Sequence, residues 1–141
     1  MRESKWIVLV VVSIFYVVLN GCEGENVSPQ KELGVYLKRL DHDPSNCILL
    51  GRIAALYQAT SEFRNAVVHY EKSLSICPND LFNRFQLGIS YYLLKEKENG
   101  ILHMDEAIKQ ARDEGRMELA KALENEKKLW LEKWQQVLEM Q

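Results

Sequence analysis

The chain has 141 residues, of which 47% are hydrophobic and 27% are charged. This balance excludes a disordered or low-complexity chain, and the length suits a single globular domain. The 18 basic residues are outnumbered by 20 acidic ones, which gives a net charge of −2 and argues against nucleic-acid binding. Three cysteines are too few for a disulfide-rich scaffold.

An apolar segment near the N-terminus is predicted to be a targeting signal. Residues 6–19 carry no charge and follow Arg2 and Lys5. As a helix these 14 residues would extend about 21 Å, whereas the hydrocarbon core of a bilayer is about 30 Å thick. The segment is therefore short for a stable membrane span and has the length of the apolar core of a signal peptide.

The residues Leu19-Asn20-Gly21-Cys22 that follow resemble the lipobox at which bacterial lipoprotein signal peptides are cleaved. The resemblance implies that residues 1–21 are removed and that Cys22 carries covalent lipid. Stable anchoring needs more than one acyl chain, because each buried methylene contributes only about 0.8 kcal/mol. We therefore expect a lipid-anchored protein of the cell membrane or outer membrane, with the periplasmic face favoured and a polar tether at 22–28. An uncleaved signal anchor and a cleaved secretory peptide with an incidental cysteine are the alternatives.

The rest of the chain has an internal period of 34 residues, the distance between Pro44 and Pro78. A shift by this period aligns side chains of the same size class. The aligned pairs are Ile53 with Leu87, Ala54 with Gly88, Tyr57 with Tyr91, Ala66 with Gly100, Tyr70 with Met104 and Ser73 with Ala107. The period and these residue classes resemble the tetratricopeptide repeat. The resemblance implies an all-α fold of stacked helical hairpins, in which small residues lie where helices approach closely.

The pattern divides the mature chain into a repeat domain and a capping helix. We expect a half repeat at 29–44, full repeats at about 45–78 and 79–112, and a C-terminal helix over 113–141. The helices expected within the two full repeats span 47–60, 63–76, 81–94 and 98–111. The last helix carries an apolar stripe on one side and charges on the other, a pattern typical of the end of a helical solenoid.

In tetratricopeptide proteins the first helix of each pair commonly contributes to a concave surface that binds a peptide. The helix expected at 81–94 has an apolar stripe in addition to its repeat-packing face, so something must cover that stripe. The expected partner-binding residues are the stripe itself, Phe82, Phe85, Ile89 and Tyr92, and the polar residues Arg52, Gln58 and Gln86. A partner peptide, the C-terminal helix folded back with Trp130 or Trp134 over the stripe, and self-association are three hypotheses for the cover.

Cys47 and Cys77 fall at the same end of the first full hairpin. Export would expose them to an oxidising compartment, where disulfides persist. A disulfide requires Cα atoms within about 7 Å of each other. Two free, half-buried thiols are the favoured expectation, and a disulfide is the alternative.

No residue pattern indicates catalysis. The sequence lacks a Ser–His–Asp set, a glycine-rich phosphate loop and zinc-ligand spacing. We therefore expect a non-enzymatic interaction or assembly module of the bacterial cell envelope, whose partner is another protein or peptide. We expect no metal, no nucleic acid and no cofactor besides the lipid on Cys22. A structural or chaperone-like envelope component without a groove ligand is the alternative, and the sequence does not specify the oligomeric state.

Overall fold

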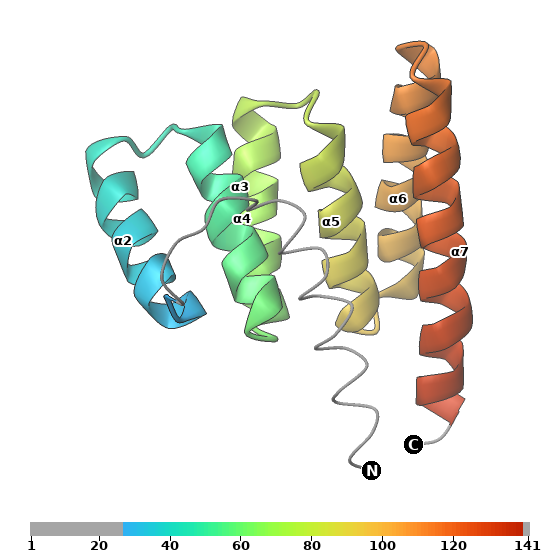
Figure 1. The fold of residues 1–141 in the computed structure, drawn as a ribbon, viewed down its shortest axis with the longest axis horizontal. Coiled ribbons are helices and arrows are strands. Elements are labelled where there is room, and N and C mark those ends of the chain that lie inside the picture. Colours follow the sequence, from blue (N-terminus) through green and yellow to red (C-terminus); the bar gives the residue numbers. More distant parts are fainter. Residues whose placement is uncertain (1–26, 140–141) are drawn as a thin grey trace.

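A computed structural model describes residues 27–139 of the chain (Figure 1). Within this range it contains six α-helices and no strand, which confirms the predicted all-α class. The helices are α2 (Pro29–His42), α3 (Cys47–Ala59), α4 (Phe63–Ile76), α5 (Leu81–Leu93), α6 (Lys97–Asp113) and α7 (Met117–Glu139). The predicted signal peptide at 1–21 and the lipidation at Cys22 lie outside the described residues. None of the helices between residues 27 and 139 is long and apolar enough to cross a membrane.

Side-chain caps set the start of three helices. At these positions a side-chain oxygen accepts a hydrogen bond from the backbone N–H three residues later, which satisfies a donor that the first helical turn leaves free. The capped pairs are Ser28 with Lys31 at 3.4 Å, Asn46 with Leu49 at 2.9 Å and Asp80 with Asn83 at 3.0 Å. The boundaries of α3 and α5 therefore follow from local sequence, through the caps Asn46 and Asp80.

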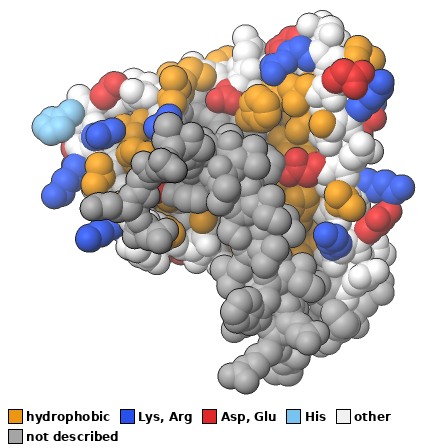
Figure 2. Space-filling view, viewed as in Figure 1, with side chains coloured by type: hydrophobic (Ala, Val, Ile, Leu, Met, Phe, Trp, Pro, Cys, Tyr) orange, Lys and Arg blue, Asp and Glu red, His pale blue; other side chains and the backbone are white. Residues whose placement is uncertain are grey.

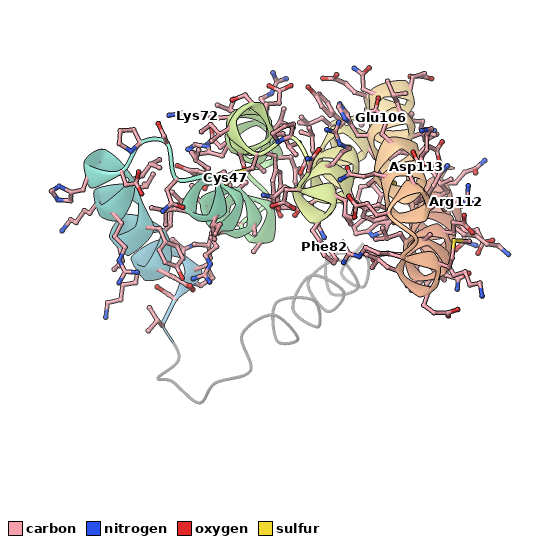
Figure 3. The ribbon with its side chains drawn as sticks, turned by 90° about the horizontal axis from the view of Figure 1, so that it is seen from above. Cys47, Lys72, Phe82, Glu106, Arg112 and Asp113 are labelled. Atoms are coloured by element: carbon pink, nitrogen blue, oxygen red, sulfur yellow. A yellow bond between two sulfur atoms is a disulfide. The ribbon has the colours of Figure 1, made fainter. Side chains whose placement is uncertain are left out.

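The helices are arranged in two layers (Figures 1 and 3). α3, α5 and α7 form one layer, which we call the first-helix layer, and α4 and α6 form the other. α2 lies beside α3 at the N-terminal end, and each helix packs against the next one in the chain. α3 also contacts α5 within the first-helix layer.

Two glycines allow α5 and α6 to approach closely. A Cβ atom added to Gly88 would lie 2.7 Å from the carbonyl oxygen of Gly100, and one added to Gly100 would lie 2.7 Å from that of Gly88. The equivalent residues of the preceding hairpin, Ala54 and Ala66, are fully buried. The structure therefore confirms that the small residues of the 34-residue pattern lie at helix contacts.

Two clusters of buried side chains join the layers. The first cluster connects α3, α4 and α5 and consists of Ala54, Ala66, Val67, Tyr70, Leu74 and Leu87. The second cluster connects α5, α6 and α7 and consists of Leu81, Phe85, Ile89, Tyr92, Leu93, Met104, Ala107, Ile108, Ala111, Ala120 and Leu123. α5 contributes to both clusters, which explains why its sequence is apolar on two faces.

Candidate functional site

Most of the apolar stripe that the sequence predicts as a partner surface is part of the core. Phe85, Ile89 and Tyr92 are only 1%, 2% and 3% exposed, and they belong to the second cluster. Trp130 and Trp134 of α7 pack against the same cluster. These three stripe residues are therefore not available to a partner, and the prediction is corrected for them. α7 contributes Ala120 and Leu123 to the cluster that contains these three stripe residues.

Phe82, the fourth residue of the stripe, remains at the surface. Its side chain is 48% exposed and points away from the layer of α4 and α6 (Figure 3). The guanidinium carbon of Arg116 lies 5.9 Å from the centre of its ring. A cation over an aromatic face is attracted by the ring quadrupole, with about 0.5–1 kcal/mol at exposed sites. Phe82 is therefore held in place and still accessible.

A second apolar residue is exposed at the equivalent position of α3. A shift by 34 residues takes Phe82 to Ile48, which is 67% exposed. Each of the two adjacent helices thus presents one apolar side chain from its first turn. Arg52 and Gln86 follow one turn later, the first exposed and the second half-buried. We call these four residues, Ile48, Arg52, Phe82 and Gln86, the ledge.

Gln58, which the sequence also assigns to partner binding, has a structural role instead. Its side chain is buried and accepts a hydrogen bond from the hydroxyl of Tyr70 at 3.2 Å. Tyr70 belongs to the first cluster, and burial raises the pKa of its hydroxyl, so that the group stays a proton donor. Gln58 therefore satisfies a buried hydroxyl, and the prediction is corrected at this position.

The ledge is positively charged because the two helices that carry it contain no acidic residue. The charged residues of α3 and α5 are Arg52 and Arg84. Arg84 points to the other layer, where it pairs with Glu106 at 2.9 Å. The salt bridges within residues 27–136 all lie between Arg84 and Glu132, which leaves the guanidinium of Arg52 without one in this part of the chain. The ledge therefore combines apolar side chains with an uncompensated cation.

A partly buried polar network supports the ledge from below. The hydroxyl of Ser73 donates to the carbonyl oxygen of Cys47 at 2.8 Å, and the amide of Asn83 donates to Ser73 at 3.0 Å. Asn83 also donates to Asp80 at 2.9 Å. The network joins the start of α3, the end of α4 and the start of α5. Sequence reasoning treated Ser73 only as a small residue, and a serine where the next copy has Ala107 was the signal for a polar partner.

Cys47 and Cys77 form a disulfide, with a Cα–Cα distance of 6.0 Å. The favoured expectation of two free thiols is wrong, and the alternative describes the structure. The bond ties the first residue of α3 to the residue that follows α4. It therefore fixes the backbone next to Ile48 of the ledge.

A cavity lies elsewhere, between α6 and α7. It has a volume of about 840 Å³, and its apolar lining residues are Leu102, Ile108 and Leu131. Its walls are charged, and ion pairs of Asp105 with Lys127 and of Arg112 with Glu124 cross it from one helix to the other. Because these charges are paired within the chain, the cavity has the character of a solvated outer surface. The part of the chain with described side chains holds no group of three or more His, Cys, Asp or Glu residues arranged to bind a metal.

Comparisons with known proteins identify no relative. No protein-family model matches the chain, and no curated protein is significantly similar to it. A functional assignment therefore depends on the residues of the ledge and on the motifs of the sequence.

Proposed function

We propose that the chain is a tetratricopeptide lipoprotein of the bacterial cell envelope, anchored through Cys22, that works as a protein interaction or assembly module. The 34-residue pattern and the consecutive helical hairpins support the family assignment. The sequence Leu19-Asn20-Gly21-Cys22 supports the lipid anchor. The disulfide between Cys47 and Cys77 supports export, because such bonds persist in oxidising compartments.

The observation that carries the interaction role is the exposure of Ile48 and Phe82 at equivalent places of adjacent helices. The other large apolar residues of α5 are buried, or partly buried in the case of Tyr91, so Phe82 is the exposed one in this helix. A segment of another protein laid across α3 and α5 would cover both side chains and reach Arg52. Full burial of an apolar side chain of this size contributes about 1.5–3 kcal/mol before the costs of ordering and desolvation. The ledge therefore suits a contact of modest affinity between two proteins.

A single substitution tests the interaction role. Phe82→Asp places a charge on the ledge without disturbing the core, and Val68→Asp places the same charge on an exposed position of α4 as a matched control. Both full-length variants are isolated from cross-linked membranes, and the companion proteins are quantified. We expect Phe82→Asp to lose a defined companion by about tenfold or more, since a charge in an apolar contact costs more than 1.4 kcal/mol. Equal recovery from the two variants would reject the ledge as the binding surface.

The intact mass of the mature protein tests the anchor. We expect the wild-type mass to show the loss of residues 1–21 and the gain of acyl chains. We expect Cys22→Ser to retain residues 1–21 and to carry no lipid. A mature protein that retains residues 1–21 would favour the uncleaved signal anchor.

One observation favours the structural alternative. Three of the four stripe residues form core, which is also expected of an envelope component without a dedicated ligand. Such a component should tolerate Phe82→Asp with an unchanged set of companions.

A further inference from the structure

The outer side of α2 carries a basic stripe. Lys31, Val35, Lys38 and His42 follow one another at spacings of four, three and four residues, and all four are exposed. This spacing places them on one face of the helix. α2 lies at the end of the fold, and Figure 2 shows Lys, Arg and His side chains gathered over that end. We call these four residues the α2 stripe.

The charges of the α2 stripe are not neutralised by neighbours. The salt bridges in the part of the chain with described side chains lie between Arg84 and Glu132, so neither Lys31 nor Lys38 takes part in one. The acidic residues of α2, Glu32 and Asp41, fall outside the stripe at 100° per residue. The stripe therefore presents cations alone, on a chain whose net charge is negative.

An apolar residue lies between the two lysines along the α2 stripe. Val35 is 48% exposed and is one turn from both Lys31 and Lys38. Basic residues around an exposed aliphatic group suit the headgroup region of an anionic bilayer, where the cations meet phosphates and the aliphatic group is removed from water. An acidic protein surface would match the cations as well.

The position of α2 in the chain favours the lipid surface over a protein. α2 begins at Pro29, seven residues after the proposed lipid-bearing Cys22. At about 3.3 Å per residue, such a tether keeps the start of α2 within roughly 23 Å of the bilayer. A retained segment at 6–19 would also bring the membrane close to this helix.

We propose that the α2 stripe lies on an anionic lipid headgroup surface and orients the domain relative to the membrane. The proposal rests on the membrane anchoring within the proposed function. It places α7, at the opposite end of the fold, away from the bilayer (Figure 1). Each basic residue near an anionic surface strengthens the contact about fivefold, so the anchor supplies attachment and the stripe supplies orientation.

Lysine footprinting on the full-length protein tests this orientation. The protein is reconstituted into phosphatidylcholine vesicles with and without phosphatidylglycerol, and acetylation rates are measured for each lysine by mass spectrometry. We expect Lys31 and Lys38 to react at least fivefold more slowly on the anionic vesicles. Lys72 of α4 and Lys133 of α7 are exposed and are expected to react equally on both. Half-molar salt should remove the difference, because it screens surface charges.

Two double variants with the same change in net charge separate the effect of the α2 stripe from that of overall charge. We expect the backbone amides of residues 29–42 to exchange more slowly on anionic vesicles than on phosphatidylcholine vesicles. Lys31→Glu combined with Lys38→Glu should abolish this difference. Lys72→Glu combined with Lys133→Glu changes the net charge equally and should preserve it. Thermal melting followed by circular dichroism confirms that both variants fold.

The outcomes separate this proposal from the anchor. A chain that fails to float with phosphatidylcholine vesicles refutes the anchor and the orientation together. A chain that floats but whose Lys31 and Lys38 react equally on both vesicles refutes the orientation alone. Protection in native membranes but not on protein-free anionic vesicles would assign the stripe to an acidic protein and would also overturn the proposal.

Discussion

Phe82 and Phe85 are three residues apart in α5 but lie in opposite environments. Phe82 is half exposed below the guanidinium of Arg116, whereas Phe85 is enclosed in the second cluster. Removal of a buried aromatic ring loses its transfer free energy and leaves a cavity, whereas an exposed ring has little to lose. Substitution of Phe85 therefore probes the stability of the fold, whereas substitution of Phe82 probes the surface.

We expect Phe85→Ala to lower the free energy of unfolding by about 3–5 kcal/mol and Phe82→Ala to lower it by less than about 1 kcal/mol. Urea denaturation followed by circular dichroism measures both. Similar losses from the two variants would contradict the packing described for α5.

His103 is a titratable residue in a partly buried position. Its ring stacks on Tyr91 with 5.5 Å between ring centres, and its Nδ1 lies 3.7 Å from a carboxylate oxygen of Glu106. Burial lowers the pKa of the imidazole, with Arg84 acting in the same direction, while Glu106 and Glu71 oppose the shift. The neutral ring is therefore the form that the fold prefers.

This preference makes stability depend on pH. Because the pKa of His103 is lower in the folded state, the unfolded chain binds the proton first as the pH falls below about 6.5. We expect the melting temperature to decrease from pH 7.5 to pH 5.5, and His103→Gln to reduce that decrease. His69→Gln, the equivalent change beside Tyr57, is the control for loss of a ring. An unchanged pH dependence in His103→Gln would show that other groups cause it.

At the scale of elements, the two central hairpins are closed by different means. A shift by 34 residues takes Cys47 and Cys77 of the α3–α4 hairpin to Leu81 and Ala111 of the α5–α6 hairpin. Leu81 and Ala111 are both buried in the second cluster. A covalent bond thus occupies the place that apolar packing occupies in the next hairpin.

We expect Cys47→Ser combined with Cys77→Ser to lower the free energy of unfolding by about 2–4 kcal/mol, since a disulfide restricts the unfolded chain. Chemical denaturation with and without a reducing agent measures the effect. The reductant should destabilise the wild type and leave the double variant unchanged. Insensitivity of the wild type would mean that the disulfide contributes little.

Substitution by alanine should destabilise the protein at Gly88 of α5 and stabilise it at Gly34 of α2. In Gly88→Ala the new methyl group would meet the backbone of α6, so the helices must separate at a cost of about 1–3 kcal/mol. A Cβ at Gly34 meets nothing within 4 Å, and Gly34→Ala should stabilise the helix by about 0.5–1 kcal/mol. Melting temperatures of the two variants check the signs, and stabilisation by Gly88→Ala would contradict the close approach.

The elements were more predictable from sequence than the surface was. Periodicity, caps at Asn46 and Asp80, and prolines fix the helices, because these signals act within a few residues. Which side of α5 faces solvent depends on how closely α3, α6 and α7 pack against it. The 34-residue repeat pattern does not specify these distances. Gly51 accommodates Asn83 between α3 and α5, whereas the equivalent Phe85 fills the space toward α6 and α7. The disulfide could not be predicted from sequence either, since its formation depends on the distance in space between Cys47 and Cys77.

At the scale of the whole molecule, α7 acts as the cover of the second cluster. Ala120 and Leu123 are part of this cluster, and Trp130 and Trp134 pack against it. Truncation after Glu114 should therefore expose a contiguous apolar surface and increase the binding of a hydrophobic dye severalfold. Fluorescence titration measures this binding against the full-length chain. Unchanged dye binding by a folded, truncated chain would contradict the role of α7.

The participation of α5 in both clusters has a consequence for how the domain comes apart. Since one helix forms a wall of each cluster, damage on either side removes support from the other. If the helices around one cluster unfolded alone, the apolar face of α5 that they cover would be exposed to water, which is unfavourable. The structure between α3 and α7 should therefore be lost in one cooperative step, with few intermediate species for a protease to capture.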